Sequence, residues 1–385
     1  MAQGRRGNDA DLRKGPPQLK IGINATSLHE KPTGLGVFTA EVSRCMSAQE
    51  KDLLVFSPIP VTGLPERFRY RIPASVKGSL NFSGNLLRAV YLNGVLPLLC
   101  RRNGIEVLFC PMIEYPFVPL VPLVVHVHDL HPLKFAPQFK RAAVHFRFSL
   151  RRIKSTARRV TVSSEAVKKE LLGATDLPED RIDVVPLAYN RELFYPRKTG
   201  GRAEFMSRYS LTRPYLLTVG NLFPYKNLDM LIESFLGIKD AIPHMLVIVG
   251  RKEFAPAGMK GGERVFFTDY VPDEDLPGFY SHAEMVVHPS LSEGFGLTPL
   301  EAMACGTPVL SSSACALPEV VGNAGILFDP RDPGALGALI VRVLQDQRLR
   351  KELTEKGLER AKMFSWEKTA SGIIMSCRKA QGEGR

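Results

Sequence analysis

Two glutamates stand eight residues apart in the segment LSEGFGLTPLEAMACGTPVL, residues 291–310. Glu293 precedes a glycine-rich loop, and Glu301 lies in a helix that Thr298 is expected to cap. The loop would present backbone N–H groups at the start of this helix, which is a favourable place for an anion. A phosphate held there would lie between two carboxylates that can accept hydrogen bonds from hydroxyls. The segment therefore has the chemistry to bind a sugar attached to a diphosphate.

The same residues also have a purely structural interpretation. Thr298 and Glu301 stand at the spacing of a capping box, in which the glutamate only satisfies backbone donors of its own helix. Glu293 could equally be a solvated loop acid. The motif alone does not separate these alternatives, so the rest of the chain has to decide between them.

A lysine stands in a similar place earlier in the chain. Lys226 lies in the segment GNLFPYKN, residues 220–227, directly before a predicted helix that Asn227 could cap. Its charge would add to the positive end of that helix, where a diphosphate would be stabilised. The segment follows a predicted strand, at the edge of a sheet where open α/β folds bind ligands. The alternative is a solvated surface lysine.

Two glycines form a short GxG segment near the start of the chain. Gly34 and Gly36 are expected in a loop between the first strand and the first helix. Such a loop allows close approach of the backbone to a phosphate or an acceptor, although the third glycine of the dinucleotide fingerprint is absent. A turn that needs a positive φ angle is an equally good explanation.

A histidine cluster follows the apolar run at residues 123–125. His126, His128, Asp129 and His131 supply imidazole and carboxylate groups, so a metal site is one hypothesis. A metallohydrolase usually needs ligands from a second motif, and the sequence offers no second cluster. We therefore favour His128 as a residue at a strand end that hydrogen-bonds a sugar or passes a proton through water.

Short apolar runs that alternate with helical patterns predict an α/β fold with parallel sheets. The clearest helix follows Asn227, with Leu228, Leu231, Ile232, Phe235 and Leu236 in one apolar stripe. Strands are expected at residues 19–24, 52–56, 106–109, 123–127, 159–162, 182–185, 215–219, 245–249, 265–268, 285–288, 307–311 and 325–328.

This pattern occurs twice, so we expect two doubly wound, Rossmann-like domains that face each other across a cleft. Residues 1–18 are expected to be a disordered tail, residues 19–190 the N-terminal domain, and residues 191–364 the C-terminal domain. Residues 365–385 are expected to form a last helix that begins after Ser365 and packs back on the N-terminal domain.

Composition limits the class of protein. The chain has 385 residues, 44% of them hydrophobic, and six cysteines without a CxxC pair, which favours a reducing compartment and no zinc site. No apolar run is long enough to span a membrane, and no signal peptide is visible. These features predict a cytoplasmic protein, either free or peripheral at the inner face of the membrane.

The basic residues are concentrated in one predicted helix. The formal net charge is +12, and residues 140–159 contain eight Lys or Arg and no acid. Apolar residues recur at helical spacing in this window, so it predicts an amphipathic basic helix that can lie on an anionic membrane surface. A helix with solvated charges is the alternative, and no motif favours nucleic acid as a partner.

These motifs together resemble retaining glycosyltransferases of family 4, which have the GT-B fold, and the chain is similar to bacterial mannosyltransferase-like group 1 enzymes. The resemblance covers most of residues 19–375. It is carried by residues 32–42 (PTGLGVFTAEV), 124–135 (VVHVHDLHPLKF), 161–171 (TVSSEAVKKEL), 219–235 (VGNLFPYKNLDMLIESF), 269–310 and 316–330 (ALPEVVGNAGILFDP).

The resemblance implies that residues 19–190 are the acceptor-side domain and residues 191–364 the nucleotide-sugar-binding domain. It also implies roles for particular residues. Glu293 would hold hydroxyls of the donor sugar, Glu301 would bind the ribose, and His128 would lie near the transferred sugar. Lys226 would neutralise the departing diphosphate, and Gly34 and Gly36 would approach the phosphates. The other donor-binding positions that it implies are Gly294, Phe295, Gly296 and Leu297 at the helix start, and Tyr270 and Val271 beside the base.

One position departs from the family pattern. Many relatives have an arginine just after the turn glycine, where this chain has Asn221. Phosphate neutralisation would then depend more on Lys226, or Arg251 after the next strand would help. The sequence of this segment is similar to that of mannosyl- and rhamnosyltransferases of surface-polysaccharide assembly. This similarity favours GDP-mannose as the donor.

The resulting hypothesis is a retaining transferase that needs no metal or other cofactor. It would move a hexose from a GDP- or UDP-linked donor to a glycan or lipid-linked acceptor, with retention by front-side attack. A synthase-type transferase with a soluble acceptor is the alternative within the same fold. A metallohydrolase built on His126–His131 and a sugar-nucleotide sensor without turnover are the alternatives from other classes.

Overall fold

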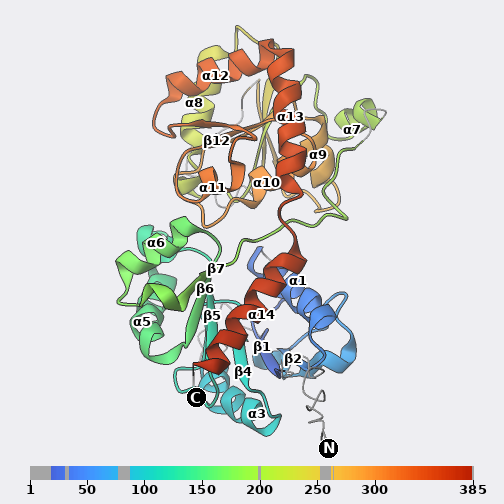
Figure 1. Ribbon diagram of the computed structural model, residues 1–385. Coiled ribbons are helices and arrows are strands. Elements are labelled where there is room, and N and C mark those ends of the chain that lie inside the picture. The colour runs from blue at the N-terminus through green and yellow to red at the C-terminus, as the bar shows by residue number, and fades with distance from the viewer. Residues whose placement is uncertain are drawn as a thin grey trace, which may run out of the picture. The chain divides into compact units, whose positions relative to one another are not determined.

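The computed structural model describes residues 19–30, 34–76, 87–197, 201–251, 262 and 264–383. The predicted tail at residues 1–18 lies outside these ranges, as do Pro32 and Thr33 beside the predicted glycine loop. The chain divides into two compact units (Figure 1). Unit 1 comprises residues 1–126, 152–160 and 370–385, and unit 2 comprises residues 127–151 and 161–369. The expected domain boundary after residue 190 stays a prediction.

The first sheet has seven strands in the order β3-β2-β1-β4-β5-β6-β7. Their bounds are β1 Ile21–Asn24, β2 Leu53–Ser57, β3 Arg69–Arg71, β4 Val107–Cys110, β5 Leu123–Val127, β6 Arg159–Val162 and β7 Ile182–Val184. β1 pairs in parallel with both β2 and β4, so that Ile23 lies opposite Val55 and Phe109. The strand order reverses between β1 and β4, as in a doubly wound fold.

The second sheet has six strands in the order β10-β9-β8-β11-β12-β13. Their bounds are β8 Tyr215–Val219, β9 Met245–Val249, β10 Val265–Asp269, β11 Met285–His288, β12 Val309–Ser312 and β13 Ile326–Phe328. β8 pairs in parallel with β9 and with β11. The order therefore reverses between β8 and β11, and ligands of open α/β sheets bind beyond the carboxyl ends of strands at such a point.

The helices alternate with the strands along the chain. Their bounds are α1 Gly34–Gln49, α3 Leu96–Arg102, α4 His131–Lys134, α5 Lys140–Thr156, α6 Glu165–Ala174, α7 Arg202–Arg208, α8 Leu228–Ile238, α9 Leu276–His282, α10 Leu297–Ala304, α11 Leu317–Val321, α12 Pro333–Gln345, α13 Gln347–Ala361 and α14 Trp366–Gly382. Short turns of 3-10 helix lie at Glu66–Phe68, Ala74–Val76, Glu179–Arg181 and Pro224–Lys226, and a π-helical turn lies at Tyr91–Val95.

The predicted α/β fold with two parallel sheets is confirmed. Each expected strand begins and ends within two residues of an observed strand. One strand was missed: β3 has only three residues, Arg-Tyr-Arg, none of them fully buried. It lies at the edge of its sheet, where a strand does not need a continuous apolar run. Alternation of hydrophobic residues therefore could not reveal it.

The core of unit 2 contains the predicted stripe of α8. Leu228, Leu231 and Phe235 are buried against residues of α12 and of the second sheet. Ile232 packs at the margin of this core, but Leu236 is 46% exposed, so its inclusion in the stripe was wrong. A helix that packs on a sheet through one narrow face leaves a residue at the edge of a broad apolar stripe exposed to solvent.

The final helix begins as the sequence predicts. The hydroxyl of Ser365 accepts a hydrogen bond from the backbone of Lys368 at 3.3 Å, which makes Ser365 the N-cap of α14. Within unit 1, Arg378 pairs with the buried Glu50 at 2.6 Å, and Gln381 donates to Glu106 at 2.7 Å. All six cysteines are free, and none of the helices in the described residues is long and apolar enough to cross a membrane.

Candidate functional site

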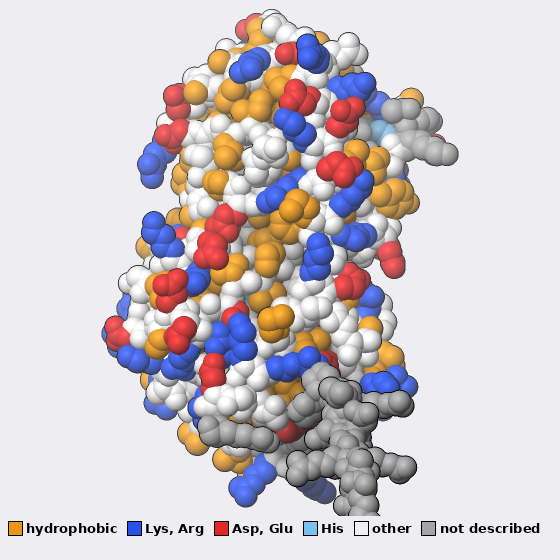
Figure 2. Space-filling model, viewed as in Figure 1, with side chains coloured by type: hydrophobic (Ala, Val, Ile, Leu, Met, Phe, Trp, Pro, Cys, Tyr) orange, Lys and Arg blue, Asp and Glu red, His pale blue; other side chains and the backbone are white. Residues whose placement is uncertain are grey.

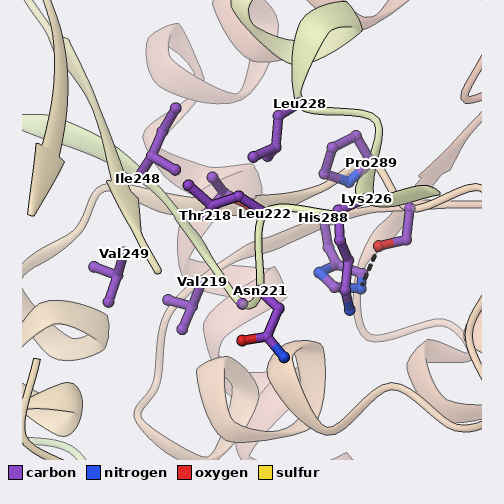
Figure 3. A pocket seen from close by; sticks show the side chains of 12 residues that line it. Thr218, Val219, Asn221, Leu222, Lys226, Leu228, Ile248, Val249, His288 and Pro289 are labelled. Atoms are coloured by element: carbon purple, nitrogen blue, oxygen red, sulfur yellow. Dashed lines mark hydrogen bonds between the residues drawn. The ribbon is translucent and has the colours of Figure 1, made fainter. Parts of the chain in front are cut away.

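A pocket lies in unit 2 where the order of the second sheet reverses. It is formed by the carboxyl ends of β8, β9 and β11 and by the segments that follow β8 and β11 (Figure 3). The lining residues are Thr218, Val219, Gly220, Asn221, Leu222, Lys226, Leu228, Ile248, Val249, His288, Pro289 and Ser290. Its position is the one that the topology predicts for a ligand.

A network of polar side chains stands at this pocket. The Nζ atom of Lys226 donates to Oε1 of Glu293 at 2.6 Å, and Nε2 of His288 lies 2.9 Å from the same oxygen. The hydroxyl of Ser290 lies 3.2 Å from Nε2 of His288, as the dashed line in Figure 3 marks. All the side chains of this network are largely buried; that of Glu293 is 12% exposed. The structure thus brings Lys226 and Glu293, which are 67 residues apart in sequence, into direct contact.

Burial and charge act in opposite directions on Glu293. Burial raises the pKa of this carboxyl, but the Lys226 ammonium and the hydrogen bond from His288 outweigh burial and hold the pKa well below its ordinary value. Burial lowers the pKa of His288 more than its contact with Glu293 raises it. Near neutral pH the site therefore contains an ionised Glu293 beside a neutral His288.

The glycine-rich loop is held from two sides. A Cβ atom at Gly294 would lie 2.1 Å from the carbonyl oxygen of His128, so only glycine fits there. The hydroxyls of Ser163 and Ser164 donate to the Gly294 carbonyl at 2.7 and 2.9 Å. Phe295 is buried and contacts Phe364 edge to face, with ring centroids 5.7 Å apart. These contacts fix the backbone that leads from Glu293 into α10.

The start of α10 differs from the prediction. Gly296, with φ of +117°, is the N-cap, because glycine alone adopts this conformation without strain. Thr298 is instead inside the helix, and its hydroxyl donates to the carbonyl of Val219 at 3.4 Å. The amides of Leu297 and its neighbours still begin the helix, and an anion site there stays a prediction. Gly306, with φ of +77°, follows the C-cap Cys305 and ends the helical path of the backbone.

Glu301 does not form the capping box. Its Oε2 atom accepts a hydrogen bond from the hydroxyl of the buried Tyr280 at 2.8 Å. Burial raises the pKa of Glu301 to about 7, although the Tyr280 hydrogen bond lowers it in part. Burial strongly disfavours the ionised form of the Glu301 carboxyl. Helix capping alone therefore explains this residue poorly.

The raised pKa of Glu301 predicts that Glu301→Gln stabilises the protein at alkaline pH. The folded state holds the proton more tightly than the unfolded state, so the penalty is absent below pH 4.5, grows as pH rises to about 7, and is then constant. Its size at pH 8 is up to about 3 kcal/mol. Calorimetry should show a melting temperature several degrees higher for the variant at pH 8 and a smaller difference at pH 5. The exposed Glu233→Gln is the control, and an equal shift at both pH values would contradict the prediction.

The other expected donor-binding residues lie at the same edge of the second sheet. Asn221 follows β8, Arg251 follows β9, and Tyr270 and Val271 follow β10. The guanidinium of Arg251 lies over the ring of Tyr270, 5.4 Å from its centroid, and the Tyr270 side chain is 60% exposed. Their roles in binding stay predictions.

Asn227 occupies the predicted N-cap position, but its side chain does not cap the helix as predicted. Asn227 has φ of +58° and occupies the N-cap position of α8, but its side chain makes no capping hydrogen bond. Its Nδ2 atom donates to the carbonyls of Pro289 and Pro330 at 3.2 and 2.6 Å. The amide thus ties the Lys226 turn to the segments that follow β11 and β13.

The glycines of the GxG segment lie in the first turn of α1, in unit 1, rather than in a loop. Both glycines belong to the helix and Gly36 has no positive φ, so a turn that needs a positive φ is wrong for Gly36. A Cβ atom at Gly34 would have no atom of the described residues within 4 Å, so none of these residues covers the backbone there. The approach of both glycines to a phosphate stays a prediction.

The histidine cluster does not form a metal centre. His126 is fully buried in unit 1, with its ring 4.6 Å from that of Phe38. Nε2 of His131 contacts the hydroxyl of Ser292 at 3.2 Å. Across the described residues, no group of three His, Cys, Asp or Glu side chains is arranged to hold a metal. His128 directly follows β5 and is partly buried, and its role near a sugar stays a prediction.

Sequence reasoning missed His288, Ser290 and Tyr280. His288 ends an apolar strand, Met-Val-Val-His, and a polar residue at that position was a usable signal. Tyr280 gave no such signal, because its contact with Glu301 joins two helices that only the fold brings together.

Two family models match the chain over most of its length. Residues 32–193 match the model "Glycosyltransferase Family 4", and residues 203–360 match the model "Glycosyl transferases group 1". The two matches are consecutive and contain all the residues of the site.

Curated proteins and solved structures agree with this result. The chain is 35% identical over 237 residues to O-antigen chain mannosyltransferase B of Escherichia coli, a match that covers 59% of this chain and 62% of that protein. It is 29% identical over 219 residues to the serotype-specific mannosyltransferase WbdA of Escherichia coli, covering 54% of this chain and 27% of WbdA. The chain thus spans less than two thirds of either relative. The crystal structure of Anabaena Alr3699/HepE in complex with UDP and glucose superposes with a TM-score of 0.69 at 18% identity, covering 93% of this chain and 98% of that one, which shows the GT-B fold.

Proposed function

Because the chain belongs to the group 1 glycosyltransferases of family 4, we propose that it transfers a hexose from a nucleoside-diphosphate donor to a glycan or lipid-linked acceptor. Mannose is the favoured sugar, since both of these Escherichia coli relatives are mannosyltransferases. The observation that carries the proposal is the buried pair of Lys226 and Glu293 beside the glycine-led start of α10. This arrangement offers a cation for a diphosphate and a carboxylate for sugar hydroxyls at one point of the sheet edge.

The diphosphate would be bound by charge and by backbone amides. Lys226 supplies a full positive charge, and the amides of Phe295, Gly296 and Leu297 lie at the positive end of α10. Groups that are already in place stabilise the developing negative charge of a leaving group without reorganisation. We therefore propose that the reaction needs no metal ion.

The rest of the donor would extend along the sheet edge. Glu293 would accept hydrogen bonds from sugar hydroxyls, and Glu301 from the ribose. The base would lie at Tyr270 and Val271, beside Arg251. During transfer the bond between the anomeric carbon and the phosphate oxygen breaks, and the acceptor oxygen bonds to the same face. Because the acceptor attacks on the face that the leaving group occupied, the configuration is retained, and the leaving phosphate takes the acceptor's proton.

Nucleotide release from a panel of GDP- and UDP-hexoses, in the presence of excess EDTA and a mixture of glycan acceptors, tests this proposal. We expect release from one donor, and NMR of the product should show the donor's anomeric configuration. Activity that EDTA abolishes would contradict metal independence. Binding of a donor without transfer would favour a sensor, and absence of binding by every donor would refute the proposal.

We also propose that an anionic membrane is a partner of the basic helix, as a lipid-linked acceptor would require. α5 exposes Lys140, Arg147 and Arg151 together with Val144 and Phe148, which are 70% and 50% exposed. Its other face is buried through Phe146, Leu150 and Ile153. Exposed apolar side chains among cations are the composition of a helix that lies in a membrane interface.

Unit 1 carries a second surface of this kind. Leu87, Val90, Val95 and Leu98 are between 41% and 61% exposed. The π-helical turn at Tyr91–Val95 advances each residue by a smaller angle than an α-helix and so keeps these four side chains near one face. Exposed Arg101 and Arg102 follow them at the end of α3. Figure 2 shows hydrophobic side chains beside Lys and Arg side chains on the surface where Figure 1 places α3.

Removal of two cations from α5 should weaken membrane binding. Each basic residue near an anionic surface contributes about 1 kcal/mol, so the double substitution Arg147→Ser and Arg151→Ser should lower partitioning into phosphatidylglycerol vesicles by about thirtyfold. Flotation of the two proteins measures this ratio. Lys351→Ser with Lys356→Ser, on α13, is the control of equal charge. Equal flotation of both double variants would contradict a role for α5.

A further inference from the structure

We infer that His288 is a positioning residue that keeps Glu293 oriented when Lys226 turns from Glu293 to the phosphates of the donor. This inference rests on the proposed function and assigns a role within the same site. It starts from an unusual feature of the polar network: a single carboxylate oxygen, Oε1 of Glu293, receives both Lys226 and His288, at 2.6 and 2.9 Å. These two partners differ in mobility and in charge.

His288 is the fixed partner. It is the last residue of β11, pairs in register with Ser311 of β12, and its side chain is 2% exposed. Lys226 ends a single 3-10 turn, and its long side chain is 17% exposed. An ammonium on a flexible stem can move by several ångströms, whereas an enclosed imidazole at the end of a central strand cannot.

The geometry also determines which form of His288 is present. Glu293 is ionised, so an Nε2 atom 2.9 Å from its oxygen must carry a proton. The Ser290 hydroxyl, 3.2 Å from Nε2, can then accept from the same N–H group. Because burial lowers the pKa of His288, the ring is neutral. It therefore donates a hydrogen bond to Glu293 without adding a charge that would compete for the phosphates.

Donor binding makes this second partner necessary. Lys226 has one charge, and a diphosphate with two negative phosphates attracts it away from Glu293. Glu293 would then be a buried carboxylate without a cation, which is strongly unfavourable unless it keeps a hydrogen bond. His288 retains Oε1, and Oε2 is directed to the sugar. Lys226 would thus neutralise the phosphates, while Glu293, held by His288, recognises the sugar.

The other titratable groups near Glu293 do not replace His288. Tyr225, from the same turn as Lys226, is a buried phenol whose pKa is raised by burial and by the charge of Glu293. Asp129, from the segment after β5, approaches Gly294 and carries a negative charge. Without His288 and with Lys226 on the phosphates, burial would raise the pKa of Glu293. Donor affinity should then fall as pH decreases.

Two variants test the inference. His288→Leu removes the N–H group and keeps the volume, whereas His288→Gln keeps an N–H donor of similar reach. Calorimetry would give dissociation constants for GDP-mannose and for GDP at pH 6 and pH 8, or for the hexose donor that the wild-type protein prefers and its free nucleotide. Thermal unfolding shows that each variant is folded.

We expect His288→Leu to weaken GDP-mannose binding at least tenfold at pH 8 and more at pH 6, with GDP binding changed less than twofold. His288→Gln should recover most of the affinity and the flat pH dependence of the wild-type protein. Equal loss for GDP and GDP-mannose, equal behaviour of the two variants, or an unchanged pH dependence in His288→Leu would overturn the inference.

A donor-free measurement separates this inference from the proposed function. If the wild-type protein binds no nucleotide sugar, the proposed function fails, but the hydrogen bond can still be tested by ¹⁵N NMR of labelled histidines. His288 should remain neutral with its proton on Nε2 from pH 6 to pH 8, both in the wild-type protein and in Lys226→Met. A cationic ring, or a proton on Nδ1, would overturn the assignment of His288 as the donor to Glu293.

Discussion

Glu293→Gln should lower the rate of hexose transfer by a factor of about 10² to 10³, the range seen when one preorganised electrostatic partner is removed from an active site. The amide has the size of the carboxylate, but it is a weaker acceptor for sugar hydroxyls and leaves Lys226 without its counter-ion. The loss should appear in kcat as well as in KM, because the carboxylate faces the sugar from which the leaving group departs. Initial rates of nucleotide release, with and without acceptor, measure both constants.

A second glutamate in the same unit, partly buried and doubly paired, provides a matched control. Glu284 is paired with Arg202 at 2.9 Å and with Arg350 at 3.1 Å, and it precedes β11 rather than following it. Glu284→Gln therefore also removes a doubly paired carboxylate, but at the opposite end of the strand from the pocket. It should lower stability and leave transfer within about twofold per folded molecule. Equal losses of activity in both variants would mean that Glu293 acts only through stability.

The fold was largely predictable because its strands are continuous apolar runs. A strand of a parallel sheet that is covered on both faces must be apolar throughout, and β9, Met-Leu-Val-Ile-Val, is fully buried. The strand order was not predictable in the same way, since the sequence has no local signal for which strands are neighbours. The reversal between β8 and β11, which creates the pocket, is a property of the assembled sheet.

The site was predictable where a role depends on backbone chemistry that the sequence displays. Gly306 ends α10 with a positive φ, as a glycine between a helix and a strand suggests. The caps failed at Thr298 and Asn227 because both side chains have better partners elsewhere, on Val219 and on Pro289 and Pro330. Local propensity identifies a residue that can cap a helix, but tertiary contacts decide whether it does.

His288 and Tyr280 were missed for a related reason. Each acts on a glutamate that the sequence had already singled out, through a side-chain contact that depends on the packing of two elements. Short motifs contain the residues that touch a ligand. The residues that set the protonation of those groups are spread over the fold and have no fixed spacing.

Lys226→Met should be the other severe substitution, with a loss of transfer of about 10² or more. Lys226 lines the pocket and directly contacts the carboxylate of Glu293. Free GDP should bind more weakly to Lys226→Met, whereas guanosine, which has no phosphate, should bind as it does to the wild-type protein. Lys226→Arg should recover part of the affinity because it restores the charge with a different shape.

A substitution of Arg251 tests whether the loss of GDP affinity is specific to Lys226. Arg251 follows the neighbouring strand β9, and its guanidinium lies over the ring of Tyr270. If the phosphates depend on Lys226, Arg251→Ala should change GDP affinity less than tenfold, and its effect should extend to guanosine because it disturbs the surroundings of the base. A larger loss in Arg251→Ala than in Lys226→Met, confined to ligands with phosphates, would instead place the main phosphate contact at the end of β9. The departure at Asn221 would then be compensated by a neighbouring strand and not by the lysine already present in the pocket.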